Sequence, residues 1–216
     1  VQYYPLKTGK YIIYSVDSIV YVNLGTKKEI KSAIIQEKID TTEKDNLGRL
    51  SFKIIQSTRN SVDTNKWEFL GTYRVTPTIK GVEVIQQNQR FIKLVSPVIQ
   101  DYKWMGNAYI NTTGNPELSY LNNWEYKYQD ISSPQKINNI DFKDCINVLQ
   151  RNDTIGNPTN RNFFSGINYS REIYARNIGL IFKEVHYEVW QPPNGSGSGY
   201  FEKGSFGLKF SILRFN

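Results

Sequence analysis

Alternation of apolar and polar residues is the feature that most constrains the fold of this sequence. Residues 184–190 read EVHYEVW, in which charged or polar residues alternate with Val, Tyr or Trp, and the segment follows Gly179. Residues 206–212 repeat the pattern, with Phe, Leu, Phe and Ile at every second position. Because side chains of an extended strand point to opposite faces in turn, both segments are predicted to be strands with one buried face.

Strand-like segments of this kind follow one another along most of the 216 residues. Turn-forming residues separate them at the spacing of an all-β domain, which predicts roughly nine to eleven short strands. Strands that follow strands without intervening helices favour antiparallel connections. No change of composition divides the chain, so residues 1–216 are predicted to form a single β-rich domain.

One segment predicts a helix instead. Residues 138–153 read NNIDFKDCINVLQRND, with Asp141 as a candidate N-cap. Apolar side chains recur there at three- and four-residue spacing, at Phe142, Cys145, Ile146 and Leu149. The predicted fold class is therefore mainly β: a curved antiparallel sheet, an open barrel or half-barrel, with one α-helix packed on it.

Five segments, in order along the chain, resemble a known family. They are residues 3–18 (YYPLKTGKYIIYSVDS), 90–97 (RFIKLVSP), 104–109 (WMGNAY), 142–148 (FKDCINV) and 174–184 (YARNIGLIFKE). Together they resemble small secreted lipoproteins of the Bacteroidota envelope, a family of uncharacterised function. The curved sheet is also loosely similar to the half-barrel of lipoprotein carrier proteins.

The resemblance implies export to the cell envelope, either the periplasm or the outer membrane. It also implies membrane attachment through a lipid on an N-terminal cysteine. Cys145 is the chain's only cysteine, so such an anchor would lie upstream of residue 1. The family transfers no catalytic residue.

Four residues are candidates for chemistry or for structure. His186 stands between two glutamates on a polar strand face, where we interpret it as solvated rather than catalytic. Cys145 shares an apolar face with Phe142, and both are predicted to be structural. Gly179 lies where an irregular segment becomes a strand, so it is predicted to adopt a positive φ. The sequence predicts no enzyme, metal or cofactor.

Aromatic residues supply the candidate binding site. Within 25 residues the chain places six large rings, which are Trp104, Tyr109, Tyr120, Trp124, Tyr126 and Tyr128. Such rings could form a core, a stacking surface for sugars or a lipid-facing surface. Basic residues give a net charge of +7 but form no nucleic-acid module, so nucleic acid is not a predicted partner.

The functional prediction is a non-enzymatic exported lipoprotein that binds an apolar ligand or a protein partner in its curved sheet. Two alternatives stay open. One is a glycan-binding module that uses the aromatic cluster at 104–128, and the other is a carboxylate-based hydrolase. The sequence does not indicate the oligomeric state.

Overall fold

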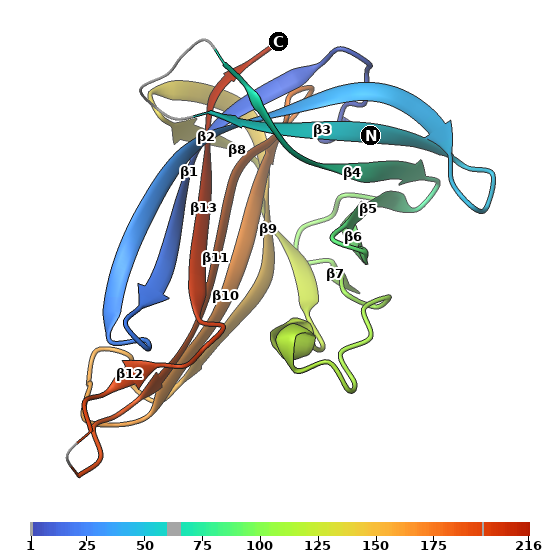
Figure 1. Cartoon of the computed structure of the whole chain (residues 1–216). Helices are drawn as coiled ribbons and strands as arrows, with labels where there is room; N and C mark the ends of the chain where they lie inside the picture. The colour runs from blue at the N-terminus through green and yellow to red at the C-terminus, as the bar shows by residue number, and fades with distance from the viewer. Residues whose placement is uncertain (1, 60–65, 196) are drawn as a thin grey trace.

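One antiparallel sheet contains all thirteen strands of the described residues. The computed structural model describes residues 2–59, 66–195 and 197–216 (Figure 1). The strands run, in chain order, β1 Tyr11–Val22, β2 Lys27–Lys44, β3 Leu50–Arg59, β4 Glu68–Thr78, β5 Gly81–Gln86, β6 Gln89–Val95, β7 Lys103–Met105, β8 Glu125–Ile137, β9 Ile140–Ile155, β10 Ser165–Ala175, β11 Gly179–Gln191, β12 Tyr200–Phe201 and β13 Phe206–Phe215.

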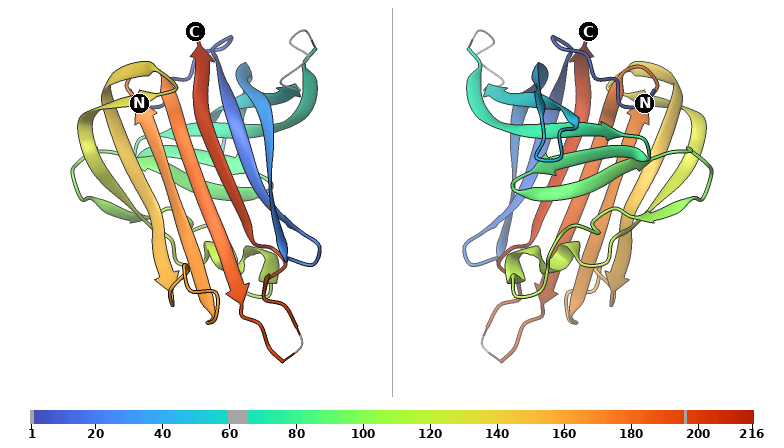
Figure 2. Two further views of the ribbon diagram at one scale, coloured as in Figure 1. Left: turned by 90° about the vertical axis from the view of Figure 1, so that its left-hand side faces the viewer. Right: turned by 90° about the vertical axis from the view of Figure 1, so that its right-hand side faces the viewer.

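The sheet curves into a nearly closed barrel. Its strand order is β6-β5-β4-β3-β2-β1-β13-β11-β10-β9-β8-β7, with β12 paired to β11, and Figure 2 shows the two ends of this order approaching each other. The Tyr128 hydroxyl on β8 accepts a hydrogen bond from the Val95 amide on β6 at 2.8 Å and donates one to the Val95 carbonyl at 2.6 Å. The Ile92 amide on β6 also donates to the Gly106 carbonyl at 2.8 Å. We call the junction of β6 with β7 and β8 the seam. A few hydrogen bonds across it take the place of a continuous ladder of backbone hydrogen bonds.

The predicted mainly β, antiparallel and curved sheet is confirmed, but it has more strands than predicted. The predicted α-helix within residues 138–153 is wrong, because Ile140–Ile155 form strand β9. Ile146 pairs with Tyr174, and Val148 pairs with Glu172, both in β10. The prediction of one domain over residues 1–216 stays a prediction.

A break in alternation explains the false helix pattern. The pairing of β8 with β9 shifts register on either side of Cys145, so buried residues recur there at uneven intervals. Phe142 and Cys145 face one hydrophobic cluster, while Ile146 and Val148 face the other. A strand buried on both faces can imitate the spacing of an amphipathic helix, and its β-branched residues favour the strand.

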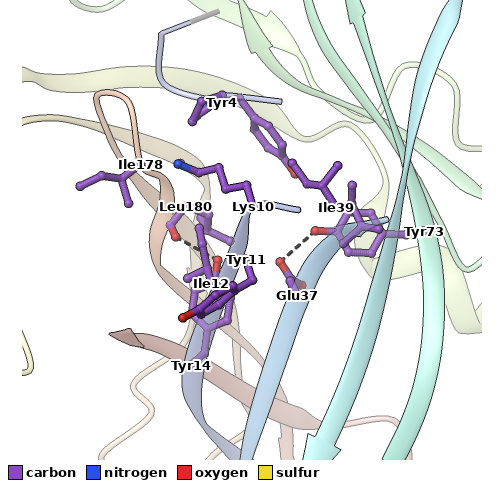
Figure 3. A pocket seen from close by; sticks show the side chains of 13 residues that line it. Tyr4, Lys10, Tyr11, Ile12, Tyr14, Glu37, Ile39, Tyr73, Ile178 and Leu180 are labelled. Carbon is purple, nitrogen blue, oxygen red and sulfur yellow. Dashed lines mark hydrogen bonds between the residues drawn. The ribbon is translucent and has the colours of Figure 1, made fainter. Parts of the chain in front are cut away.

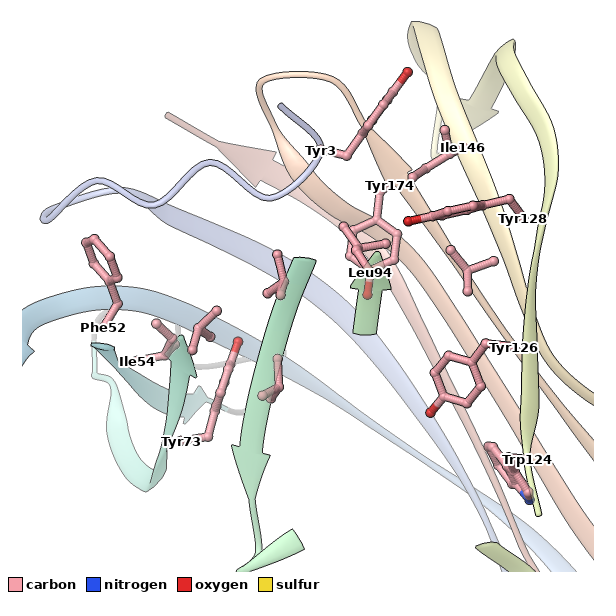
Figure 4. Packing of buried hydrophobic residues seen from close by; sticks show 14 of the residues in the cluster. Tyr3, Phe52, Ile54, Tyr73, Leu94, Trp124, Tyr126, Tyr128, Ile146 and Tyr174 are labelled. Carbon is pink, nitrogen blue, oxygen red and sulfur yellow. The ribbon is translucent and has the colours of Figure 1, made fainter. Parts of the chain in front are cut away.

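Tyrosine and tryptophan side chains fill much of the barrel interior, the place where a helix was expected. Figure 4 shows this cluster, in which Tyr126, Tyr128 and Tyr174 are almost completely buried. The N-terminal segment adds Tyr3 to the same cluster. Aromatic rings bury large areas each, so a few of them contribute much of the core.

The only helix among residues 2–59, 66–195 and 197–216 is the short 3-10 helix η1, Pro116–Leu121. It lies at one open end of the barrel, on the inner side of the sheet (Figure 2). Its Tyr120 packs on Tyr187 of β11 and on Phe206 of β13, with ring centroids 5.1 and 5.5 Å away. No helix within these ranges is long and apolar enough to cross a membrane.

Gly179 begins β11 with a φ of +112°, a conformation that residues with a side chain rarely adopt. We expect Gly179→Ala to lower the free energy of unfolding by about 1 kcal/mol or more. An added Cβ would meet only ordinary contacts, 3.5 Å from Ile12 and 3.8 Å from Pro5, so backbone strain is the cause. Urea denaturation measures the change.

Gly71→Ala is the matched control, because Gly71 also lies in the sheet, has no positive φ, and has open space where a Cβ would go. Its stability should stay at or above that of the wild type. Equal stabilities for the two variants would contradict the strain argument.

Candidate functional site

A cavity of about 360 Å³ opens inside the barrel, and we call it the chamber. Its walls come from the inner faces of β11 and β13, from the turn between β5 and β6, and from η1 with the start of β8. Most of the wall is aromatic or aliphatic, including Phe91, Leu118, Tyr120, Trp124, Phe206 and Leu208. The volume lies within the range of small-molecule binding sites, which starts at roughly 300 Å³.

The alternating pattern of β11 and β13 builds one wall of the chamber. Val185 pairs with Leu208, and Tyr187 pairs with Phe206, so the apolar rows predicted from the sequence lie side by side on one face. One polar residue interrupts this face, because Lys183 pairs with Phe210 in the same register. The wall therefore changes from apolar near η1 to charged near its inner end.

A buried carboxylate lies beyond this inner end. Glu172 of β10 is 1% exposed and accepts hydrogen bonds from Lys93, Gln150 and Tyr174 at 2.7, 2.8 and 2.6 Å. Burial alone would raise its pKa, but the nearby Lys93 and Lys183 cations and these hydrogen bonds hold the pKa below the ordinary value. Glu172 is therefore an anion in the folded protein at neutral pH.

A second carboxylate, Glu37 of β2, lies close to the first. It accepts hydrogen bonds from the Tyr73 hydroxyl and the Gln56 amide, both at 2.8 Å, and Figure 3 shows the contact with Tyr73. Burial raises the pKa of this carboxyl group. Glu37 and Glu172, together with Lys93 and Lys183, line a cavity of about 50 Å³ that we call the inner cavity.

Lys183 lies where the inner cavity and the chamber meet, because it lines both. Burial and the neighbouring Lys93 cation lower the pKa of its ammonium group. Its nitrogen lies 5.8 Å from the centre of the Phe210 ring. Within the described part of the chain, no hydrogen bond or ion pair joins Lys183 to another side chain. No feature of the sequence distinguished this lysine from the others.

The six aromatic residues singled out from the sequence do not form one surface. Three of them, Tyr120, Trp124 and Tyr126, line the chamber. Tyr128 is fully buried, and Trp104 packs against it with ring centroids 4.6 Å apart. Tyr109 is 58% exposed on the outside, beneath the Arg90 guanidinium. Their interplanar angles, between 48° and 69° in the four pairs they make with one another, are not those of a flat stacking platform.

His186 lies on the face of β11 opposite the chamber wall. Its Nε2 is 3.3 Å from Glu184, and its Nδ1 is 3.9 Å from Glu188, whose carboxylate also accepts a 2.5 Å hydrogen bond from Tyr21. The two neighbouring carboxylates, Glu188 first and then Glu184, stabilise the imidazolium and raise the pKa of His186. The group belongs to the outer sheet surface and takes no part in the chamber.

Cys145 is buried against Phe142 and Ile173 in the second hydrophobic cluster. Burial raises the pKa of its thiol to about 11, which leaves it protonated at neutral pH. Among residues 2–59, 66–195 and 197–216, no group of three or more His, Cys, Asp and Glu side chains is placed to hold a metal ion.

Comparison with known proteins does not assign this chain to a family. No protein-family model matches the sequence, and no curated protein matches it. Among solved structures, a candidate exported protein with a YmcC-like fold from Bacteroides fragilis matches 99% of this chain and 98% of its own. The two share 12% identity with a TM-score of 0.38, which supports no inference about function. The resemblance to envelope lipoproteins stays a prediction.

The Lys93–Glu172 pair yields a stability prediction. Glu172→Gln keeps the shape of the side chain but leaves a buried lysine without its counter-charge, and we expect a loss of about 3 kcal/mol in the free energy of unfolding. The control is Glu125→Gln, because Glu125 pairs with Lys103 on the surface, where both side chains are more than half exposed. Exposed pairs contribute about 1 kcal/mol or less.

Urea denaturation at neutral pH measures both variants. If Glu172→Gln cost no more stability than Glu125→Gln, the buried pair would not support the barrel as described.

Proposed function

We propose that this protein is a non-enzymatic binding protein that holds a small, largely apolar ligand in the chamber. The observation that carries the proposal is the chamber itself, about 360 Å³ and lined by ten aromatic or aliphatic residues and seven polar ones. Binding sites for small molecules combine such walls with a few polar groups. Here the charged groups are Lys93 and Lys183 at the inner end. The neutral polar groups include Gln86, Gln87 and Gln89 around the turn between β5 and β6.

The hydrolase alternative has one observation in its favour. Glu37 and Glu172 line the same inner cavity, and their pKa values are shifted in opposite directions, as in many acid–base pairs. The inner cavity of about 50 Å³ has room for a few water molecules but not for a sugar. We therefore favour a structural role for the two carboxylates.

The glycan-binding alternative required exposed, parallel rings. Trp124, Tyr126 and Tyr128 are buried, and Trp104 is tilted against its neighbours. The aromatic residues that line the chamber support an apolar ligand better than a sugar surface.

The cellular setting is a further part of the proposal and rests on the sequence resemblance alone. We propose an exported protein of the cell envelope, attached to the membrane by a lipid on a cysteine upstream of Val1. Expression of the full reading frame followed by membrane fractionation and mass spectrometry of the N-terminal peptide tests this part. A diacylated cysteine supports it, and an unmodified N-terminus contradicts it.

A neutral fluorescent probe tests ligand binding directly. N-phenyl-1-naphthylamine is apolar and uncharged, so it reports on the apolar walls and not on the lysines. We expect saturable binding with a rise in fluorescence as the probe leaves water. Leu208→Trp should weaken this binding, because the larger indole would occupy part of the chamber.

Leu213→Trp is the matched control on the same strand, because Leu213 is 40% exposed and does not line the chamber. It should bind the probe as the wild type does. Either no saturable signal from the wild type or undiminished binding by Leu208→Trp would contradict the proposal.

A further inference from the structure

The chamber meets a charged surface at its inner end, where neighbouring side chains already engage two carboxylates. Each of the two carboxylate oxygens of Glu37 and of Glu172 already accepts a hydrogen bond from a neighbouring side chain. Gln150 is also fully engaged, since its amide donates to Glu172 and its oxygen accepts from Ser170 at 2.7 Å. A ligand acceptor is therefore better matched to this end than a ligand donor.

The donor that remains is the Lys183 ammonium group. Lys93 forms an ion pair with Glu172 at 2.7 Å. Lys183 attracts Glu172 and Glu37 electrostatically but forms no hydrogen bond with either. An ammonium group carries three N–H donors. Lys183 is half-buried and lines the chamber, so a ligand acceptor beside it would gain a charge-assisted hydrogen bond.

We propose that the chamber binds an amphipathic carboxylic acid, with the carboxylate on Lys183 and the hydrocarbon chain along the apolar rows of β11 and β13. This inference rests on the proposed function and adds the chemical class of the ligand. A charged acceptor is chosen because charge-assisted hydrogen bonds are about twice as strong as neutral ones.

The charge balance favours a carboxylate over a phosphate. Two carboxylates and two lysines surround the inner cavity, and one lysine of the two is already paired at hydrogen-bonding distance. These charges balance, so a head group with one negative charge disturbs the balance less than one with two. A phosphate monoester carries close to two charges at neutral pH, and the second would be repelled by Glu37 and Glu172.

The strand geometry sets the length of the hydrocarbon chain. Lys183, Val185 and Tyr187 lie on one face of β11, and the last of them contacts Tyr120 of η1. Four residues of strand span roughly 13 Å. A linear chain of medium length therefore runs from Lys183 to the opening beside η1.

Displacement of N-phenyl-1-naphthylamine by decanoic acid and by 1-decanol tests the assignment, because the two differ only in the head group. For the wild type we expect the acid to bind at least roughly tenfold more tightly, the strength of a hydrogen bond to a charged group. Lys183→Met should remove this preference while leaving the affinities for 1-decanol and for the probe unchanged. Retained probe binding shows that the variant is folded.

Lys209→Met removes the same charge from an exposed position of β13 outside the chamber and should keep the preference for the acid. The inference is overturned if the wild type binds acid and alcohol equally, if Lys183→Met keeps the preference, or if decyl phosphate binds more tightly than decanoic acid. Failure of the neutral probe to bind would instead overturn the proposed function, and this inference with it.

Discussion

A buried ion pair between Lys93 of β6 and Glu172 of β10 holds together two strands that lie far apart in the sheet. Eight positions separate these strands in the order of the sheet, so the pair spans the barrel rather than a ladder. Both side chains are largely removed from water, at 13% and 2% exposure. Removing either charge from such a pair is strongly destabilising, because the other charge would remain buried without a counter-charge. The seam between β6 and β8, with only a few hydrogen bonds of its own, depends on this internal contact.

The same network explains why the interior is not a continuous apolar core. Gln150 and Tyr174 orient the Glu172 carboxylate, and Tyr73 with Gln56 does the same for Glu37. These groups need space around them that aliphatic packing would not leave. The inner cavity and the adjoining chamber are the result, with Lys183 on the boundary between them. The charged residues that stabilise the barrel thus also lie beside the proposed binding site.

Strand alternation was sufficient to predict the sheet and part of the chamber. Alternation predicts a buried face for the row of Val185 and Tyr187 and for the row of Phe206 and Leu208, and the two rows pair as neighbours on the wall of the chamber. Alternation could not predict β9, because a register shift beside Cys145 and burial on both faces produced helix-like spacing.

The charged residues of the site could not be predicted from the sequence. Glu172 and Lys93 are 79 residues apart, and neither lies in a motif. Their contact arises only when the barrel brings β6 against β10, and no local pattern encodes that closure. Lys183 was equally hidden, because it continues an ordinary alternating strand in which a lysine would normally face solvent.

The ionisation of Glu172 is the most direct test of this account. Carbon-13 NMR of the labelled side-chain carboxyl group, followed from pH 7 downward, measures its pKa in the folded protein. The account predicts a pKa below the ordinary value of 4.5, because Lys93 and Lys183 stabilise the anion against the cost of burial. The stability that Glu172 supplies should then be complete above that ordinary value and be lost as the pH falls through the folded pKa. A pKa above 4.5 would contradict the account, because burial would then outweigh the two lysines.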